Sequence, residues 1–194
     1  IHTGPKEKLD LTTQTQPVML TAGIACYRAW LAETGLAPAV VAGHSLGEYT
    51  ALVAAGALTL ADALPLVRLR APAMQDAVPV GEGAMAAILG IDAQAVRDGC
   101  EAVAVSSGEV VEAVNFNDPK QTVIAGSKAG VEKGCEVLKA RGAKRALPLP
   151  VSAPFHSSLM KPAAERLREK LASVAITVPR IAVEELRALI DAGR

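Results

Sequence analysis

One short motif, Gly-His-Ser-Leu-Gly at residues 43–47, most constrains what this chain can form. An apolar run at 40–42 precedes it and a helical pattern follows it. Glycines two positions before and after a serine are typical of a nucleophile elbow, a sharp turn from a strand into a helix. We expect a β-carbon at either glycine to collide with the reversing chain. The motif therefore predicts a raised Ser45 hydroxyl, with the Leu46 backbone N–H directed at an oxyanion formed beside it.

Composition narrows the class of protein further. The chain has 194 residues, of which 51% are hydrophobic, and its formal net charge is zero. This neutrality gives no global attraction to nucleic acid or to anionic membranes. No run of 18 apolar residues and no signal-peptide pattern is present, so we expect a soluble, cytoplasmic protein. We also expect it to be a monomer. Cys26, Cys100 and Cys135 lie far apart, which argues against a disulfide framework and a zinc site, and no metal or redox cofactor is expected.

The hydrophobic pattern predicts two parts of α/β class. Residues 84–151 read as strand, helix, strand, strand, helix and strand, at 84–89, 93–104, 110–116, 122–125, 128–141 and 144–149. This βαββαβ order is that of a ferredoxin-like small domain, inserted into a larger core. The core would comprise 1–83 and 152–194, with an α/β-hydrolase-like parallel sheet. A cleft between the two domains is the expected substrate site.

Within the core, the pattern predicts further elements. They are helices at 17–33, 46–57, 60–77, 157–173 and 183–192, and a strand at 39–42. Pro65 and Pro72 each remove a backbone donor, so we expect the 60–77 helix to break or kink.

Ser45 and His156 are the residues with the clearest chemistry. A serine at this turn is either a nucleophile or merely the N-cap of the following helix. His44 adjoins Ser45 on a tight turn and should project away from it. His156 follows a proline-punctuated segment at a helix start, where the helix dipole disfavours imidazolium and so favours a neutral general base. The alternative is a histidine satisfied in the core or at the surface.

Four motifs together resemble one enzyme family. They are Gln14-Thr15-Gln16-Pro17, Gly43 to Tyr49, Leu69-Arg70-Ala71-Pro72-Ala73-Met74-Gln75, and Ala153-Pro154-Phe155-His156-Ser157-Ser158-Leu159-Met160, in this order. The chain thus resembles the malonyl-CoA:acyl carrier protein transacylases of fatty acid synthesis and the related acyltransferase domains of polyketide synthases. Members of that family extend beyond this sequence at both ends, so we expect the catalytic core to be incomplete here.

The resemblance implies roles for individual residues. Ser45 and His156 match a Ser-His dyad, in which a backbone carbonyl rather than a carboxylate orients the histidine. Arg70 matches the arginine that forks onto the malonyl carboxylate, a geometry that only guanidinium offers. Otherwise Arg70 is a solvated helix residue; Arg68, two positions away, should point elsewhere. Gln16 matches a residue that lines the active site, or it simply caps a helix.

Three further residues match substrate-site positions. Phe155 fills the space that a methylmalonyl branch would need, which favours malonyl, and it is core-like in any interpretation. Asn115 and Asn117 match a segment that leaves a strand toward the cleft, although asparagines that form turns explain them nearly as well.

The sequence therefore predicts a ping-pong acyltransferase. Malonyl-CoA would acylate Ser45, and the phosphopantetheine thiol of acyl carrier protein would take the malonyl group. Residues 128–145 are rich in lysine and arginine, and Lys139, Arg141 and Lys144 could dock this acidic carrier, although a solvated helix face explains them equally well. Two alternatives are a serine acyl hydrolase on the same elbow and a catalytically incomplete fragment that binds carrier protein.

Overall fold

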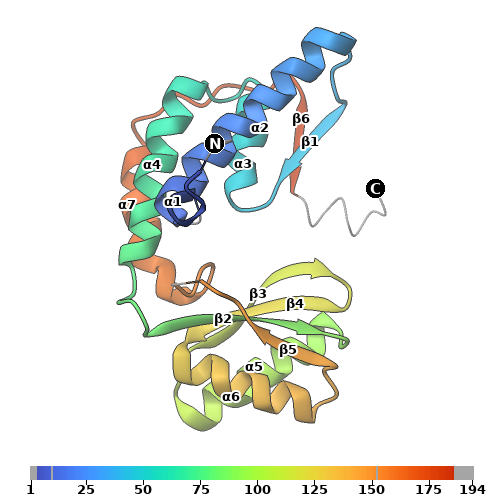
Figure 1. Cartoon of the computed structure of the whole chain (residues 1–194), viewed down its shortest axis with the longest axis vertical. Coiled ribbons are helices and arrows are strands. Elements are labelled where there is room, and N and C mark those ends of the chain that lie inside the picture. The colour runs from blue at the N-terminus through green and yellow to red at the C-terminus, as the bar shows by residue number, and fades with distance from the viewer. Residues whose placement is uncertain (1–3, 10, 152, 186–194) are drawn as a thin grey trace. The chain divides into compact units, whose positions relative to one another are not determined.

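The computed structural model describes residues 4–9, 11–151 and 153–185 (Figure 1). The chain divides into two compact units, one of residues 1–72 with 166–194 and the other of residues 73–165. In these described ranges, no helix is long and apolar enough to cross a membrane.

The first unit packs helices beside a parallel pair of strands. Its elements are α1 (Lys6–Leu9), α2 (Thr12–Thr34), β1 (Val40–Gly43), α3 (Leu46–Ala54), most of α4 (Leu60–Asp76), most of α7 (Lys161–Leu171) and β6 (Ala182–Glu185). Its core is formed by Leu20 and Ile24 of α2, by Ala63, Leu66 and Val67 of α4 and by Leu58 just before α4, and residues of α3 and α7 pack against them. Strand β1 therefore leads into α3 beside a packed layer of helices. This is the setting that a nucleophile elbow needs.

Strand β6 includes residues 183–185, where the sequence predicts the start of a helix at 183–192. Val40 pairs with Ala182, and the parallel register continues along both strands. The backbone just before β6 is held by the segment that follows α3, since the Thr177 N–H donates to the Ala57 carbonyl and the Arg180 N–H donates to the Ala55 carbonyl. These long-range bonds bring the segment beside β1 in extended form. Residues 186–192 lie outside the described residues.

The prolines do not break their helices. Helix α4 runs through Pro65 and Pro72, and α2 starts at Thr12 and contains Pro17, so a break in α4 is wrong while a kink at its prolines stays a prediction. Each proline of α4 deprives the carbonyl four residues earlier of its donor. Those residues, Ala61 and Arg68, are exposed, so water can hydrate their carbonyls.

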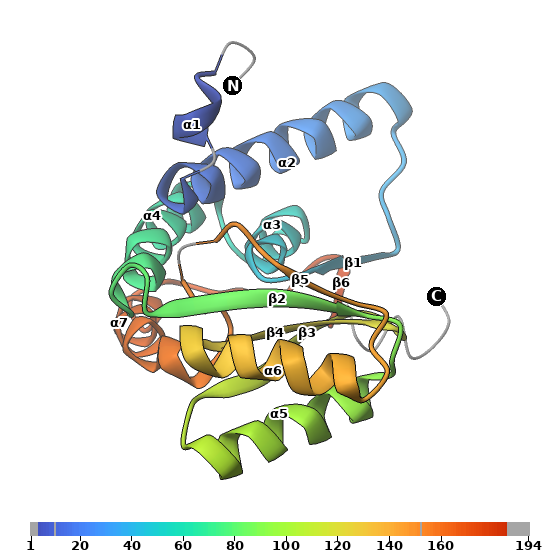
Figure 2. The same ribbon diagram turned by 60° about the horizontal axis from the view of Figure 1, so that its bottom comes forward.

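The second unit is an antiparallel sheet covered on one face by two helices (Figure 2). Its elements are β2 (Gly83–Leu89), α5 (Ala93–Ser107), β3 (Val111–Asp118), β4 (Gln121–Ser127), α6 (Lys128–Ala140), β5 (Arg145–Pro148) and the 3-10 turn η1 (Ser158–Met160). The sheet order is β3-β4-β2-β5. All predicted elements of residues 84–151 are present in the predicted order.

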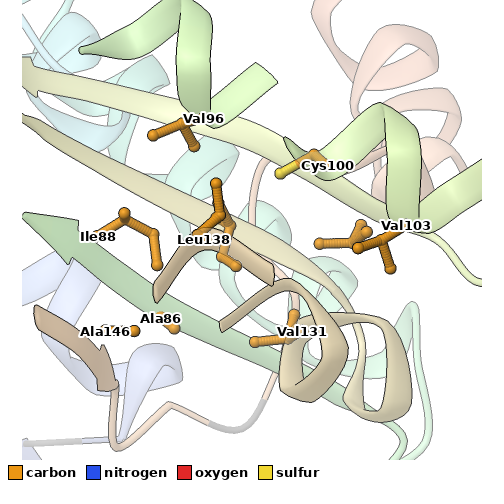
Figure 3. Close-up of a cluster of buried hydrophobic side chains, with 10 residues drawn as sticks. Ala86, Ile88, Val96, Cys100, Val103, Val131, Leu138 and Ala146 are labelled. Atoms are coloured by element: carbon orange, nitrogen blue, oxygen red, sulfur yellow. The ribbon is translucent and has the colours of Figure 1, made fainter. Parts of the chain in front are cut away.

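Apolar side chains from α5, α6 and the sheet form one core (Figure 3). Ile88, Val96, Ile124 and Leu138 are fully buried in it. Cys100 lies in the same core, and burial, with the neighbouring Cys135 and Glu112, raises the pKa of its thiol to about 12. The Cys100 thiol therefore stays protonated at neutral pH and is no nucleophile.

Candidate active site at the Ser45 elbow

Ser45 occupies a backbone conformation that serine rarely adopts. Its φ is 55° and its ψ is −108°, between β1 and the first residue of α3, Leu46. Such a conformation costs free energy and persists only where the surrounding structure enforces it. The Ser45 side chain makes no capping hydrogen bond to α3. The alternative that Ser45 merely caps the helix is therefore wrong.

The two glycines of the elbow differ in their surroundings. A β-carbon at Gly43 would lie 2.0 Å from the carbonyl carbon of Gly47 and 2.3 Å from the Glu48 nitrogen. A β-carbon at Gly47 would have no neighbour within 4 Å. The predicted collision is thus confirmed for Gly43 and wrong for Gly47, because the chain closes over residue 43 while residue 47 already lies on the outer side of the helix start.

This difference gives a paired stability prediction. Gly43→Ala should lower the free energy of unfolding by roughly 2–4 kcal/mol, since backbone atoms must move to admit the methyl group. Gly47→Ala, the matched control inside a helix, should leave it unchanged or raise it by up to about 1 kcal/mol. Urea unfolding of both variants, followed by circular dichroism, measures the two values. Equal losses in both variants would contradict the packing described for Gly43.

Arg70 connects the elbow to α2. Its side chain is 8% exposed, whereas that of Arg68 is exposed, as predicted. Arg70 Nη2 donates to Ser45 Oγ at 2.9 Å, and Nη1 donates to Gln16 Oε1. Burial lowers the pKa of Arg70 from its usual value, and nearby Tyr49 and Glu48 raise it. An arginine in this setting keeps its charge, so a buried cation lies beside the Ser45 hydroxyl.

Gln16 is buried within α2, four residues after the first residue of that helix. Its amide Nε2 donates to Thr12 Oγ1 at 3.2 Å while its Oε1 accepts from Arg70. The alternative that Gln16 caps the helix is therefore wrong, because α2 begins earlier than the pattern indicated. Gln16 instead holds Nη1 of the Arg70 guanidinium in place.

Tyr49 is a site residue that sequence reasoning missed. The Arg70 guanidinium carbon lies 5.8 Å from the centre of the Tyr49 ring, within the range of a cation–π contact. Burial raises the pKa of Tyr49, although Arg70 lowers it in part. The signal was available, since Tyr49 follows Ser45 by four positions at a helix start and so lies on the same helix face.

His156 occupies a turn of the second unit. Its side chain is exposed and its φ is 66°, in the left-handed region that few non-glycine residues adopt. The predicted helix at 157–173 begins instead as η1 at Ser158, and α7 proper begins at Lys161. The Ser157 hydroxyl donates to the Pro154 carbonyl at 2.7 Å and closes the turn.

The remaining predicted residues also lie in the second unit. Phe155 packs against two apolar clusters, which confirms its core-like character. Asn115 is buried and Asn117 is exposed. Both lie inside β3 rather than after its end, so the interpretation of Asn115 and Asn117 as turn residues is wrong.

A groove of about 510 Å³ lies between α2, β1 and α3 in the first unit. His44, Gly47 and Thr50 line it, together with apolar residues of α2 and α3. His44 is exposed there, as expected for a side chain that projects away from its neighbour Ser45. In the part of the chain that the structure describes, no three histidine, cysteine or carboxylate side chains are grouped to hold a metal ion.

Comparison with known proteins decides the family. Residues 1–189 match the family described as the acyl transferase domain. The chain belongs to this acyl transferase family. It is 54% identical over 180 residues to the malonyl CoA-acyl carrier protein transacylase of Escherichia coli K12, covering 93% of this chain and 58% of that protein. The resemblance carried by the four sequence motifs is thereby confirmed.

Solved structures of relatives agree with this assignment. The acyl-carrier-protein S-malonyltransferase of Burkholderia pseudomallei 1710b is 66% identical, with a TM-score of 0.89 over 93% of this chain and 58% of that one. A malonyl-transacylase solved in complex with a holo type II PKS acyl-carrier protein is 49% identical, with a TM-score of 0.89 and the same coverage. This acyl transferase chain thus spans less than two thirds of the length of these relatives, and its mixed α/β fold is theirs over that span.

Proposed function

We propose that this acyl transferase chain moves a malonyl group from malonyl-CoA to the phosphopantetheine thiol of acyl carrier protein. His156 takes the proton of Ser45 while Oγ attacks the thioester carbonyl, and the coenzyme A thiolate leaves and is protonated. The carrier thiol then attacks malonyl-Ser45, with His156 again as the base. Ser45 and His156 belong to different units, and their pairing is part of the proposal.

The Arg70–Ser45 contact is the observation that carries this proposal. A malonyl group on Ser45 has its carboxylate carbon two bonds beyond the ester carbonyl carbon, within reach of a guanidinium already at 2.9 Å from Oγ. A carboxylate offers two oxygens to the planar fork and thus a stronger partner than the neutral oxygens now bound. We assign to the Leu46 N–H the role of hydrogen-bond donor to the oxyanion, since the first amides of a helix have no acceptor within that helix.

The geometry of Arg70 and Ser45 also argues against the two alternative functions, a serine hydrolase and a fragment that only binds carrier protein. A general serine hydrolase has no use for a buried cation beside its acyl group, so Arg70 disfavours that reaction. A fragment that only binds carrier protein has no need of the strained backbone at Ser45.

We further assign Phe155 as the side chain that excludes a branched acyl group, and Asn115 and Asn117 as residues that line the substrate site.

One experiment separates the three functions. The chain is incubated with malonyl-CoA and its intact mass is followed, first alone and then with holo acyl carrier protein. Transfer predicts an adduct on Ser45 that persists in water and disappears upon addition of the carrier. A hydrolase would lose the adduct in water alone, and a binding fragment would never form it.

We propose a basic surface for the carrier, made of Lys139, Arg141 and Lys144 at the end of α6 and the start of β5. All three side chains are exposed. Acyl carrier protein is acidic, and opposite charges on two partners mainly accelerate their encounter. One relative was solved in complex with its acyl-carrier protein, which supports a macromolecular partner of this kind.

Charge reversal tests this surface. Replacing Lys139, Arg141 and Lys144 by glutamate should slow transfer from malonyl-Ser45 to the carrier by roughly 10-fold or more at low salt, and flatten the salt dependence. Acylation by malonyl-CoA should stay near normal. The control reverses exposed Lys6, Arg168 and Lys170, an equal change in net charge. Stopped-flow rates that fall equally in both triple variants would contradict docking at this surface.

We also propose the finer description of the fold. The order β2-α5-β3-β4-α6-β5 and the antiparallel sheet β3-β4-β2-β5 support a ferredoxin-like small domain at 84–151. The β1–α3 elbow and the parallel β1–β6 pair support an α/β-hydrolase-like core of 1–83 and 152–194. A cytoplasmic location and a monomeric state remain predictions.

A further inference from the structure

A carboxylate outside the predicted site holds the turn that carries His156. Glu112, on β3, accepts a hydrogen bond at its Oε2 from the Ser158 backbone N–H, at 2.7 Å. The two residues are 46 positions apart, so this bond ties the sheet to the segment just after His156. Glu112 is half-buried, and partial removal from water strengthens such a charge-assisted bond.

The segment just before His156 is held by packing. Pro154 is fully buried, and a β-carbon at Gly83 of β2 would lie only 2.3 Å from its Cδ. Phe155 packs against buried Met85 and Val123 of the sheet. The turn is therefore anchored before His156 by apolar contacts and after it by Glu112.

The side of β3 on which Glu112 lies follows from strand alternation. Val111 and Ala113 join the core formed with α5 and α6, so Glu112 between them faces the opposite side of the sheet. Val114 and Phe155 share an apolar cluster on the sheet that is separate from that core. A carboxylate on this side is well placed to receive a backbone N–H of the His156 turn.

We propose that Glu112 is a positioning residue for His156. By holding the Ser158 amide it keeps His156 in its left-handed conformation, with φ of 66°, which a histidine does not favour by itself. The conformation of this turn sets the direction of the imidazole. The inference rests on the proposed function, since the orientation of His156 matters for catalysis only if His156 is the base.

The test compares three single variants of the full chain. Glu112→Ala removes the acceptor, and Glu112→Gln keeps an oxygen acceptor without the charge. Glu109→Ala is the matched control, because Glu109 is also half-buried in this unit and its Oε2 accepts a 2.6 Å hydrogen bond from the Ser127 hydroxyl, away from the turn.

Two readouts are measured. Glu112→Ala should lower kcat for acylation of Ser45 about 10- to 100-fold with little change in KM, because a misdirected base slows chemistry rather than binding. Glu112→Gln should recover most of this loss, and Glu109→Ala should match the wild type. Independently of activity, NMR of Glu112→Ala should show at least about tenfold faster solvent exchange of the Ser158 amide and a displaced His156 imidazole signal.

The outcomes are distinct. An unchanged Ser158 amide in Glu112→Ala overturns the proposal, and so does acylation that falls no more than in Glu109→Ala. A wild-type chain that forms no malonyl-Ser45 refutes the proposed function instead. In that case an unchanged His156 signal in Glu112→Ala still overturns the positioning role of Glu112, and a displaced signal that returns in Glu112→Gln supports it.

Discussion

Replacement of Ser45 by alanine should abolish malonylation of the chain, lowering the rate by roughly four orders of magnitude or more. The nucleophilic oxygen is lost while the elbow stays in place, since alanine adopts the same unfavourable backbone conformation as serine. Intact-mass detection after incubation with malonyl-CoA measures the adduct. A malonyl adduct on Ser45→Ala at the wild-type rate would assign the chemistry to another residue.

His156→Ala is the companion variant, and it should behave differently. Removal of a general base typically costs 10²- to 10⁴-fold, so slow labelling of Ser45 should remain at about that level. A labelling rate equal to that of the wild type would show that Ser45 loses its proton to another group.

Arg70→Ala should separate the recognition of malonyl from that of acetyl. Loss of the guanidinium leaves the malonyl carboxylate without its partner, and malonyl transfer should weaken by roughly 2–5 kcal/mol. Acetyl has no carboxylate to pair, so acetyl transfer should hold or rise. The ratio of kcat/KM for malonyl-CoA to that for acetyl-CoA measures the effect.

Two controls sharpen this prediction. Arg68→Ala, at an exposed position on the same helix, should leave both substrates unaffected. Arg70→Lys keeps a positive charge without the planar fork and should recover only part of the preference. Equal losses for malonyl and acetyl in Arg70→Ala would mean that Arg70 serves the structure of the elbow, through Ser45 and Gln16, rather than the substrate.

The local features of the fold could be predicted, because they are encoded in short segments. The apolar run at 84–89 and the turns between the strands act within a few residues, and the elements of residues 84–151 formed as expected with ends shifted by a few positions. In the structure, the side chains of Asp92 and Ser127 cap α5 and α6, and this too is a local interaction. The elbow is equally local. Only the role of Gly47 was misjudged, since the path of the chain around it is not readable from the motif.

Features that depend on distant partners could not be predicted. The segment at 182–185 has a helical pattern, but the bonds of the preceding Thr177 and Arg180 to the segment after α3, and its own pairing with β1, hold it in extended form. The pairing of Gln16 with Arg70 joins residues 54 positions apart; the family resemblance pointed to both residues, but not to this bond. Glu112 carries no signal at all in the sequence, because a glutamate on a strand is ordinarily a solvated residue.

At position 45, the residue that would make the chain most stable to heat differs from the residue that the proposed reaction needs. Glycine alone adopts φ of 55° with ψ of −108° without steric cost, so the chain would relax if residue 45 were glycine. Selection of variants for thermal survival alone would therefore favour the residue that has no hydroxyl. Stabilisation of this protein by directed evolution accordingly needs an activity screen, or a library that leaves position 45 untouched.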